Sequence, residues 1–88
     1  MPSVYKIKYL KSVLVDDIPL LPKTVGLRVK KAIEERLMVD PIGLGKPLRY
    51  SLKGSRRVRV GDYRIVYYID ADMVVITAIK HRKDVYES

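Results

Sequence analysis

The sequence predicts an α+β domain of two layers, in which a helical hairpin packs on one face of a largely antiparallel, twisted sheet of four strands. Three observations support this prediction. Apolar and polar residues alternate in four segments, two helical segments are indicated before residue 40 by a capping residue and by an apolar stripe at helical spacing, and tight turn signals separate the last three strands. The order along the chain is therefore β-α-α-β-β-β, and strands that follow helices as a group are typical of the α+β class.

The first half of the chain supplies one strand and the two helices. Val4–Leu10 alternates, with tyrosines and an isoleucine on one side and lysines on the other. The next segment, Ser12–Leu20, is expected to form a short helix that Ser12 caps and Pro19 bends or ends. Pro22 opens the second helix, Lys23–Met38. The apolar stripe of that helix recurs at helical spacing and comprises Val25, Val29, Ala32, Ile33 and Leu37.

The second half supplies the remaining three strands. Asp40–Pro41 ends the helix, and the glycines of "PIGLGKPL" predict a loop. Leu48 and Leu52 are expected to be core anchors. The predicted strands and the turns between them are Arg56–Val60, Gly61–Asp62, Tyr63–Asp70, Asp70–Ala71–Asp72 and Met73–Lys80.

Length and composition limit the function classes. Residues 1–88 fit a single domain. The chain has no cysteine, and its one histidine cannot form a metal site by itself, so we expect neither a metal nor another cofactor. The N-terminus lacks an apolar segment of signal-peptide length, and no apolar run is long enough to cross a membrane. We therefore expect a cytoplasmic protein that binds no membrane.

The positive charge is concentrated in one part of the sequence. The net charge is +8, and the stretch from Lys46 to Arg64 holds seven basic residues against one acidic residue, Asp62. A local basic excess in a small domain indicates a polyanionic partner, either nucleic acid or an acidic protein segment. A solvated basic face that only aids solubility is the alternative.

Strand alternation places part of this charge on one face of the sheet. Val58 and Val60 suit the helical layer, which sends Arg57 and Arg59 to the open face. Like charges that lie beside each other in a sheet repel, so this arrangement requires an explanation.

Two stretches resemble a known family. "GKPLRYSLKGSRRVRVGDYRIVYYID" and then "VVITAIKHRKDVY" are similar to the RelE/ParE toxin superfamily of type II toxin–antitoxin systems, and the order of elements agrees as well. The resemblance implies a RelE-like toxin that enters the ribosomal A site and cuts messenger RNA as an endoribonuclease, with the RNA 2′-hydroxyl as nucleophile. It also implies a cognate antitoxin that wraps around the toxin.

The family motif gives the candidate site residues by position. Arg64 is the expected main stabiliser of the transition state, and Arg57 and Arg59 orient phosphates, because a guanidinium grips two phosphate oxygens and stays charged. His81 is the candidate for proton transfer, and Tyr86 is expected to stack on a base or pass a proton. Further RNA contacts are expected from Lys53, Arg56, Lys80, Arg82 and Lys83.

One departure from the family leaves the general base open. Studied relatives have lysines at the positions of Arg57 and Arg59, and an arginine effectively cannot lose its proton. Two other functions compete with the nuclease. A ParE-like inhibitor of DNA gyrase would share the fold and cut nothing, and a basic RNA-binding domain would not be toxic.

Overall fold

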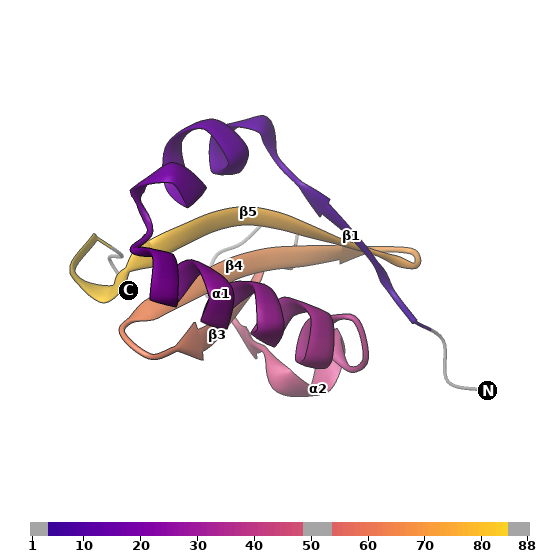
Figure 1. Ribbon diagram of the computed structural model, residues 1–88. Helices are drawn as coiled ribbons and strands as arrows, with labels where there is room; N and C mark the ends of the chain where they lie inside the picture. The colour runs from indigo at the N-terminus through magenta and orange to yellow at the C-terminus, as the bar shows by residue number, and fades with distance from the viewer. Residues whose placement is uncertain (1–3, 49–53, 85–88) are drawn as a thin grey trace.

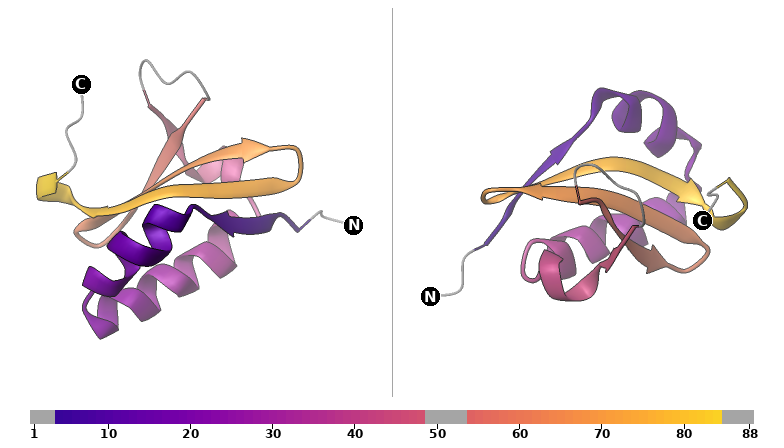
Figure 2. Two further views of the ribbon diagram at one scale, coloured as in Figure 1. Left: turned by 90° about the horizontal axis from the view of Figure 1, so that it is seen from above. Right: turned by 180° about the vertical axis from the view of Figure 1, so that it is seen from behind.

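A central sheet with helices on one face is the architecture of the protein. The computed structural model describes residues 4–48 and 54–84. Figure 1 shows helix α1 (Lys23–Ala32) in front of the sheet, and the view from above in Figure 2 shows that α1 and the helical segment before it lie on the same side of the sheet. The predicted α+β class and its two layers are confirmed.

The sheet has five strands in the described part of the chain, one more than predicted. Its order is β1-β5-β4-β3-β2, with β1 parallel to β5 and every other pair antiparallel. The strands are β1 (Lys6–Tyr9), β2 (Lys46–Pro47), β3 (Arg56–Val60), β4 (Tyr63–Asp70) and β5 (Met73–His81).

The additional strand, β2, comes from the segment that the glycines predicted to be a loop. Lys46 and Pro47 pair with Arg57 and Arg56 at the edge of the sheet. Two residues are too short to show alternation, and a proline, which has no N–H, is tolerated in an edge strand. For both reasons, the sequence pattern did not predict β2.

The first predicted helix is two shorter segments. Residues after β1 form η1 (Val13–Asp17) and then η2 (Ile18–Leu20), which has Pro19 in its first turn. The predicted cap by Ser12 is wrong, because its side chain makes no capping hydrogen bond and its backbone is already helical (φ −59°, ψ −34°). An N-cap needs a non-helical backbone.

The second predicted helix is present almost as expected. Helix α1 continues into η3 (Ile33–Leu37), and Met38 N–H donates to the Ile33 carbonyl at 3.0 Å, so the last turn is wider than an α-turn. Four of the five stripe residues are buried, and Val25 is half-buried. Two short helical segments complete the described fold: α2 (Pro41–Leu44), which Asp40 caps, and η4 (Arg82–Asp84).

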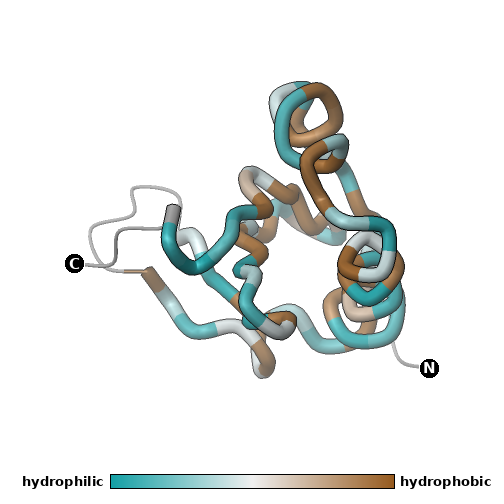
Figure 3. The backbone as a smooth tube through the Cα atoms, turned by 60° about the vertical axis from the view of Figure 1, so that its left-hand side comes forward, coloured by the Kyte–Doolittle hydropathy of each residue, from teal (hydrophilic) through white to brown (hydrophobic). Residues whose placement is uncertain are grey.

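The core lies between the helical layer and the strands. Its fully buried members come from both layers: Val13, Val29, Ile33, Leu37, Ile65, Tyr67, Val74, Ile76 and Ile79. Figure 3 shows apolar and polar residues alternating around the helical turns, as an amphipathic layer requires. In the described part of the chain, no helix is long and apolar enough to cross a membrane.

Candidate nucleic-acid interface

Three cationic residues form a row across the open face of the sheet. Arg59 on β3 is paired in register with Arg64 on β4, and Arg64 is paired with Lys80 on β5. Residues paired directly across strands project from the same face, and adjacent strands lie about 4.8 Å apart. The row therefore concentrates three positive charges on three neighbouring strands.

The predicted division of β3 between two faces is confirmed. Val58 and Val60 pack against the buried core. Arg59 is exposed and Arg57 is half-buried. Arg57 pairs with Val66, two positions along β3 from Arg59, and the Val58–Ile65 pair lies between them. Arg57, Arg59 and Arg64 thus share the open face, as the alternation of the sequence predicted.

Arg56 does not join this group. Side chains alternate along β3, so Arg56 lies on the helical side together with Val58 and Val60. There its Nη1 donates to the carbonyls of Ile42 at 3.1 Å and Gly45 at 3.0 Å. Beside it, the buried Tyr67 hydroxyl donates to the Pro41 carbonyl at 2.6 Å. Arg56 therefore anchors the α2 segment to β3, and this structural role separates it from the RNA-binding group in which the sequence placed it.

Burial is the main cause of a raised pKa at the Tyr67 phenol. Its removal from water raises the pKa, the positive charge of Arg56 acts in the opposite direction, and Asp40 raises it further. Gly45 lies against the phenol so closely that a β-carbon there would overlap the Tyr67 side chain. A residue without a side chain is thus needed where the α2 segment meets β4.

Lys80 is held by a carboxylate that the sequence analysis missed. Asp17 of η1 is only 6% exposed; its Oδ1 accepts from Lys80 Nζ at 2.6 Å, and its Oδ2 accepts from the Ile79 N–H at 2.9 Å. β1 pairs with β5 only as far as Ile76, so Asp17 covers the edge that β1 leaves open. The pattern showed an acidic residue on a short helix, but nothing local linked it to a strand 62 residues away.

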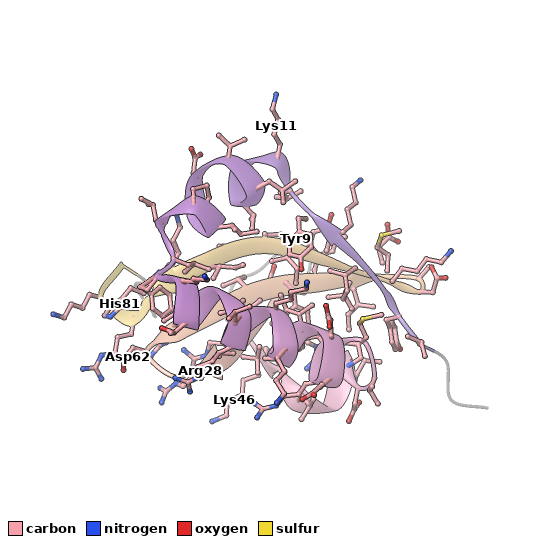
Figure 4. The ribbon with its side chains drawn as sticks, in the orientation of Figure 1. Tyr9, Lys11, Arg28, Lys46, Asp62 and His81 are labelled. Atoms are coloured by element: carbon pink, nitrogen blue, oxygen red, sulfur yellow. The ribbon has the colours of Figure 1, made fainter. Side chains whose placement is uncertain are left out.

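His81 lies away from the cationic row. It pairs with Tyr63 and packs edge-on against that ring, with centroids 5.2 Å apart, and its Nδ1 accepts the Lys83 N–H at 3.2 Å. Its strand neighbour Lys80 projects from the other face. Figure 4 shows His81 at the end of the sheet near Asp62.

The remaining predicted residues fall at the chain's end or outside the described residues. Arg82 pairs loosely with Asp62, with Nε and Oδ1 3.9 Å apart, and its exposed side chain and that of Lys83 extend from η4. Lys53, Leu52 and Tyr86 lie outside the described residues. Within residues 4–48 and 54–84, no cluster of three or more potential ligands could hold a metal ion.

Comparison with known families decides the class of this protein. Residues 10–86 match the model of the ParE toxin of type II toxin–antitoxin systems. The chain belongs to this toxin family. It is 34% identical over 84 residues to toxin RelG of Mycobacterium tuberculosis, covering 93% of this chain and 95% of that toxin. It is also 30% identical over 76 residues to toxin RelE3 of Methanocaldococcus jannaschii, covering 83% of this chain and 86% of that toxin.

Solved structures give the same assignment for this RelE/ParE toxin. A crystal structure of the toxin–antitoxin complex RelBE2 from Mycobacterium tuberculosis superposes with a TM-score of 0.81 and 32% identity, covering 90% of this chain and 99% of that one. A RelB–RelE complex from Methanococcus jannaschii, at 24% identity and a TM-score of 0.71, shows the shared fold over 90% of this chain and 98% of that one. The resemblance seen in the sequence motifs is confirmed.

Proposed function

We propose that this type II toxin is a ribosome-dependent endoribonuclease that cleaves messenger RNA in the ribosomal A site. The observation that carries the proposal is the row of Arg59, Arg64 and Lys80 on the open face, with Arg57 two residues before Arg59 on the same face. Fixed cations on a rigid sheet suit a phosphodiester, because they meet the charge that develops on phosphate oxygens as the 2′-oxygen attacks phosphorus and the P–O5′ bond breaks to release the 5′-hydroxyl.

The proposed roles follow from position in the row. Arg64 lies on β4 between two cationic neighbours, so it is assigned the transition-state charge, and Arg59 and Arg57 orient the flanking phosphates. Lys80, held by Asp17, completes the row as a fixed cation. Lys53, Arg82 and Lys83 remain proposed contacts to more distant phosphates.

None of the residues in the cationic row is assigned the role of general base. Arginines are unsuited to act as a base. His81 lies on the side of Tyr63, so the described geometry gives it no direct access to the row. We therefore propose that the ribosome aligns the RNA for in-line attack and that alignment supplies much of the rate enhancement. Tyr86 remains the proposed stacking residue.

The proposed partners follow from the family. The RelBE2 neighbour was solved as a toxin–antitoxin complex, and we propose that a cognate antitoxin wraps around this chain in the cytoplasm. An extended acidic segment suits a protein of net charge +8 and would reach it rapidly by electrostatic steering.

A second candidate function has one observation in its favour. The matching family model is named for ParE rather than RelE, so a ParE-like inhibitor of DNA gyrase with no nuclease activity is the alternative. The toxin names RelG and RelE3 among its relatives favour the nuclease.

Two assays run side by side test the proposal. Primer extension on messenger RNA from induced cells should show discrete new 5′ ends within coding regions, and Arg64→Ala should abolish them, whereas Lys30→Ala on the exposed side of α1 should not. A gyrase supercoiling assay with purified toxin should show no inhibition. Intact messenger RNA together with inhibited supercoiling would refute the nuclease and support the alternative.

A further inference from the structure

A β-bulge interrupts β5 before it reaches the cationic row. Val66 and Tyr67 are neighbours on β4, but they pair with Ala78 and Ile76, so the register passes over Thr77. The Thr77 hydroxyl donates to the Val66 carbonyl at 3.2 Å, which ties the extra residue to the adjacent strand. Bulges of this kind re-aim the side chains that follow them and are frequent beside active sites.

The bulge moves Lys80 to the open face. Side chains alternate between the two faces of a strand, so an uninterrupted β5 would place Lys80 on the same face as Ile76, which lies in the core. One extra residue reverses this order. Ile79 is therefore the core residue, and Lys80 joins Arg64 on the open face. The sheet departs from regular pairing at a point that brings this cation into the row.

Asp17 then fixes the ammonium group of Lys80. It comes from η1, the helical segment that follows β1 and lies next to β5 in Figure 1. Its Oδ2 accepts from the Ile79 N–H at 2.9 Å, and its Oδ1 accepts from Lys80 Nζ at 2.6 Å. Asp17 is 6% exposed, whereas the Lys80 side chain is 44% exposed. One buried carboxylate therefore determines where a partly exposed lysine holds its charge.

We propose that Asp17 is a positioning residue for RNA cleavage and that it acts through Lys80. The inference rests on the proposed nuclease function. A lysine side chain without a fixed partner samples many rotamers, and ordering it during the reaction costs conformational entropy. Asp17 orders Lys80 beforehand, so the positive charge is in place when the phosphate arrives. Asp17 also offsets the repulsion between Lys80 and Arg64, which are paired directly across two strands.

The two oxygens of Asp17 have separable roles. The Ile79 N–H needs a single acceptor, which an amide oxygen would supply as well as a carboxylate does. The contact to Lys80 favours a carboxylate, because a charge-assisted hydrogen bond is stronger than a neutral one. Asp17→Asn therefore keeps an acceptor for the backbone of β5 and removes the charge that holds the lysine.

Cleavage of messenger RNA on ribosomes by Asp17→Asn tests the proposal. Rates are measured over a range of ribosome concentrations, at a temperature at which melts show every variant to be folded. The kcat should fall about tenfold and KM should change less than about twofold, because the ordered lysine acts on the charge of the transition state. Asp16→Asn, which alters an exposed carboxylate of the same segment, should cut at the parent rate. In a Lys80→Met background, adding Asp17→Asn should change kcat less than about twofold, because Asp17 acts only through Lys80.

Two kinetic results would overturn the positioning role: a folded Asp17→Asn that cuts at the parent kcat, or a loss that is equally large with and without Lys80. NMR of the lysine ammonium groups gives a readout that needs no RNA. The Lys80 ammonium protons should exchange slowly with water in the parent and in Asp16→Asn, and rapidly in Asp17→Asn; equal exchange in all three would overturn the contact itself. A parent toxin that cuts no messenger RNA would refute the proposed function, which differs from parent cleavage that is insensitive to Asp17.

Discussion

Replacing Asp17 with alanine should destabilise the protein strongly, because this buried carboxylate has two partners in the last third of the chain. Loss of Oδ2 leaves the Ile79 N–H without its acceptor at 2.9 Å, and an unsatisfied buried donor costs about 1–3 kcal/mol. Loss of Oδ1 also releases Lys80, but that side chain is 44% exposed, so the ion pair contributes less than about 1 kcal/mol. We expect a total of about 2–3 kcal/mol.

A thermal melt followed by circular dichroism measures this cost. For a domain of this size, about 2–3 kcal/mol corresponds to a fall in Tm of about 10–20 °C. Asp17→Asn keeps an oxygen acceptor for Ile79 and should lose about 1 kcal/mol or less. Asp16→Ala, which removes an exposed carboxylate from the same segment, is the control and should change stability by less than about 0.5 kcal/mol. Equal melting of Asp17→Ala and Asp16→Ala would refute the role assigned to the buried carboxylate.

Three further predictions concern the site and the α2 segment. Arg64→Ala should abolish toxicity while changing stability by about 0.5–1 kcal/mol, as growth curves and melts would show; continued toxicity would contradict its role. His81→Ala should reduce cleavage on ribosomes far less than Arg64→Ala, and an equal loss in the two variants would restore His81 as a catalyst. Tyr67→Phe should cost about 1–3 kcal/mol, because the Pro41 carbonyl loses a buried donor. The raised pKa of Tyr67 favours the protonated phenol in the folded state, so its stabilisation is complete below the ordinary pKa of 10.0 and is lost as pH rises through the folded pKa. Urea melts at neutral and strongly alkaline pH should therefore show a smaller alkaline loss for Tyr67→Phe than for the parent, and an identical loss would exclude this linkage.

The sequence predicted the elements whose side chains alternate or recur over several residues. The helix from Lys23, the three long strands and the face carrying Arg57 and Arg59 were all visible, because burial imposes a period on neighbouring residues. The short edge strand at Lys46–Pro47 could not be predicted, because two residues are too few to show an alternating pattern.

Long-range contacts account for the parts of the site that were missed. Asp17 reads as a polar helix residue until η1 is placed against the uncovered edge of β5. Likewise, Arg56 belongs to a basic run in sequence, and only the fold directs its guanidinium to two carbonyls near α2. The separation of His81 from the arginines depends on strand parity and on its packing against Tyr63. Such roles arise from tertiary pairing, which no local pattern records.

Cleavage of one messenger RNA in two states tests the central claim most directly. Purified toxin is incubated with the RNA either bound in ribosomes with an empty A site or free in solution, and the products are mapped at single-nucleotide resolution. Our account predicts rapid cutting at the A-site codon on ribosomes, little cutting of free RNA, and no products with Arg64→Ala in either state. Equal cutting of free and ribosome-bound RNA, or cutting by Arg64→Ala at the parent rate, would contradict it.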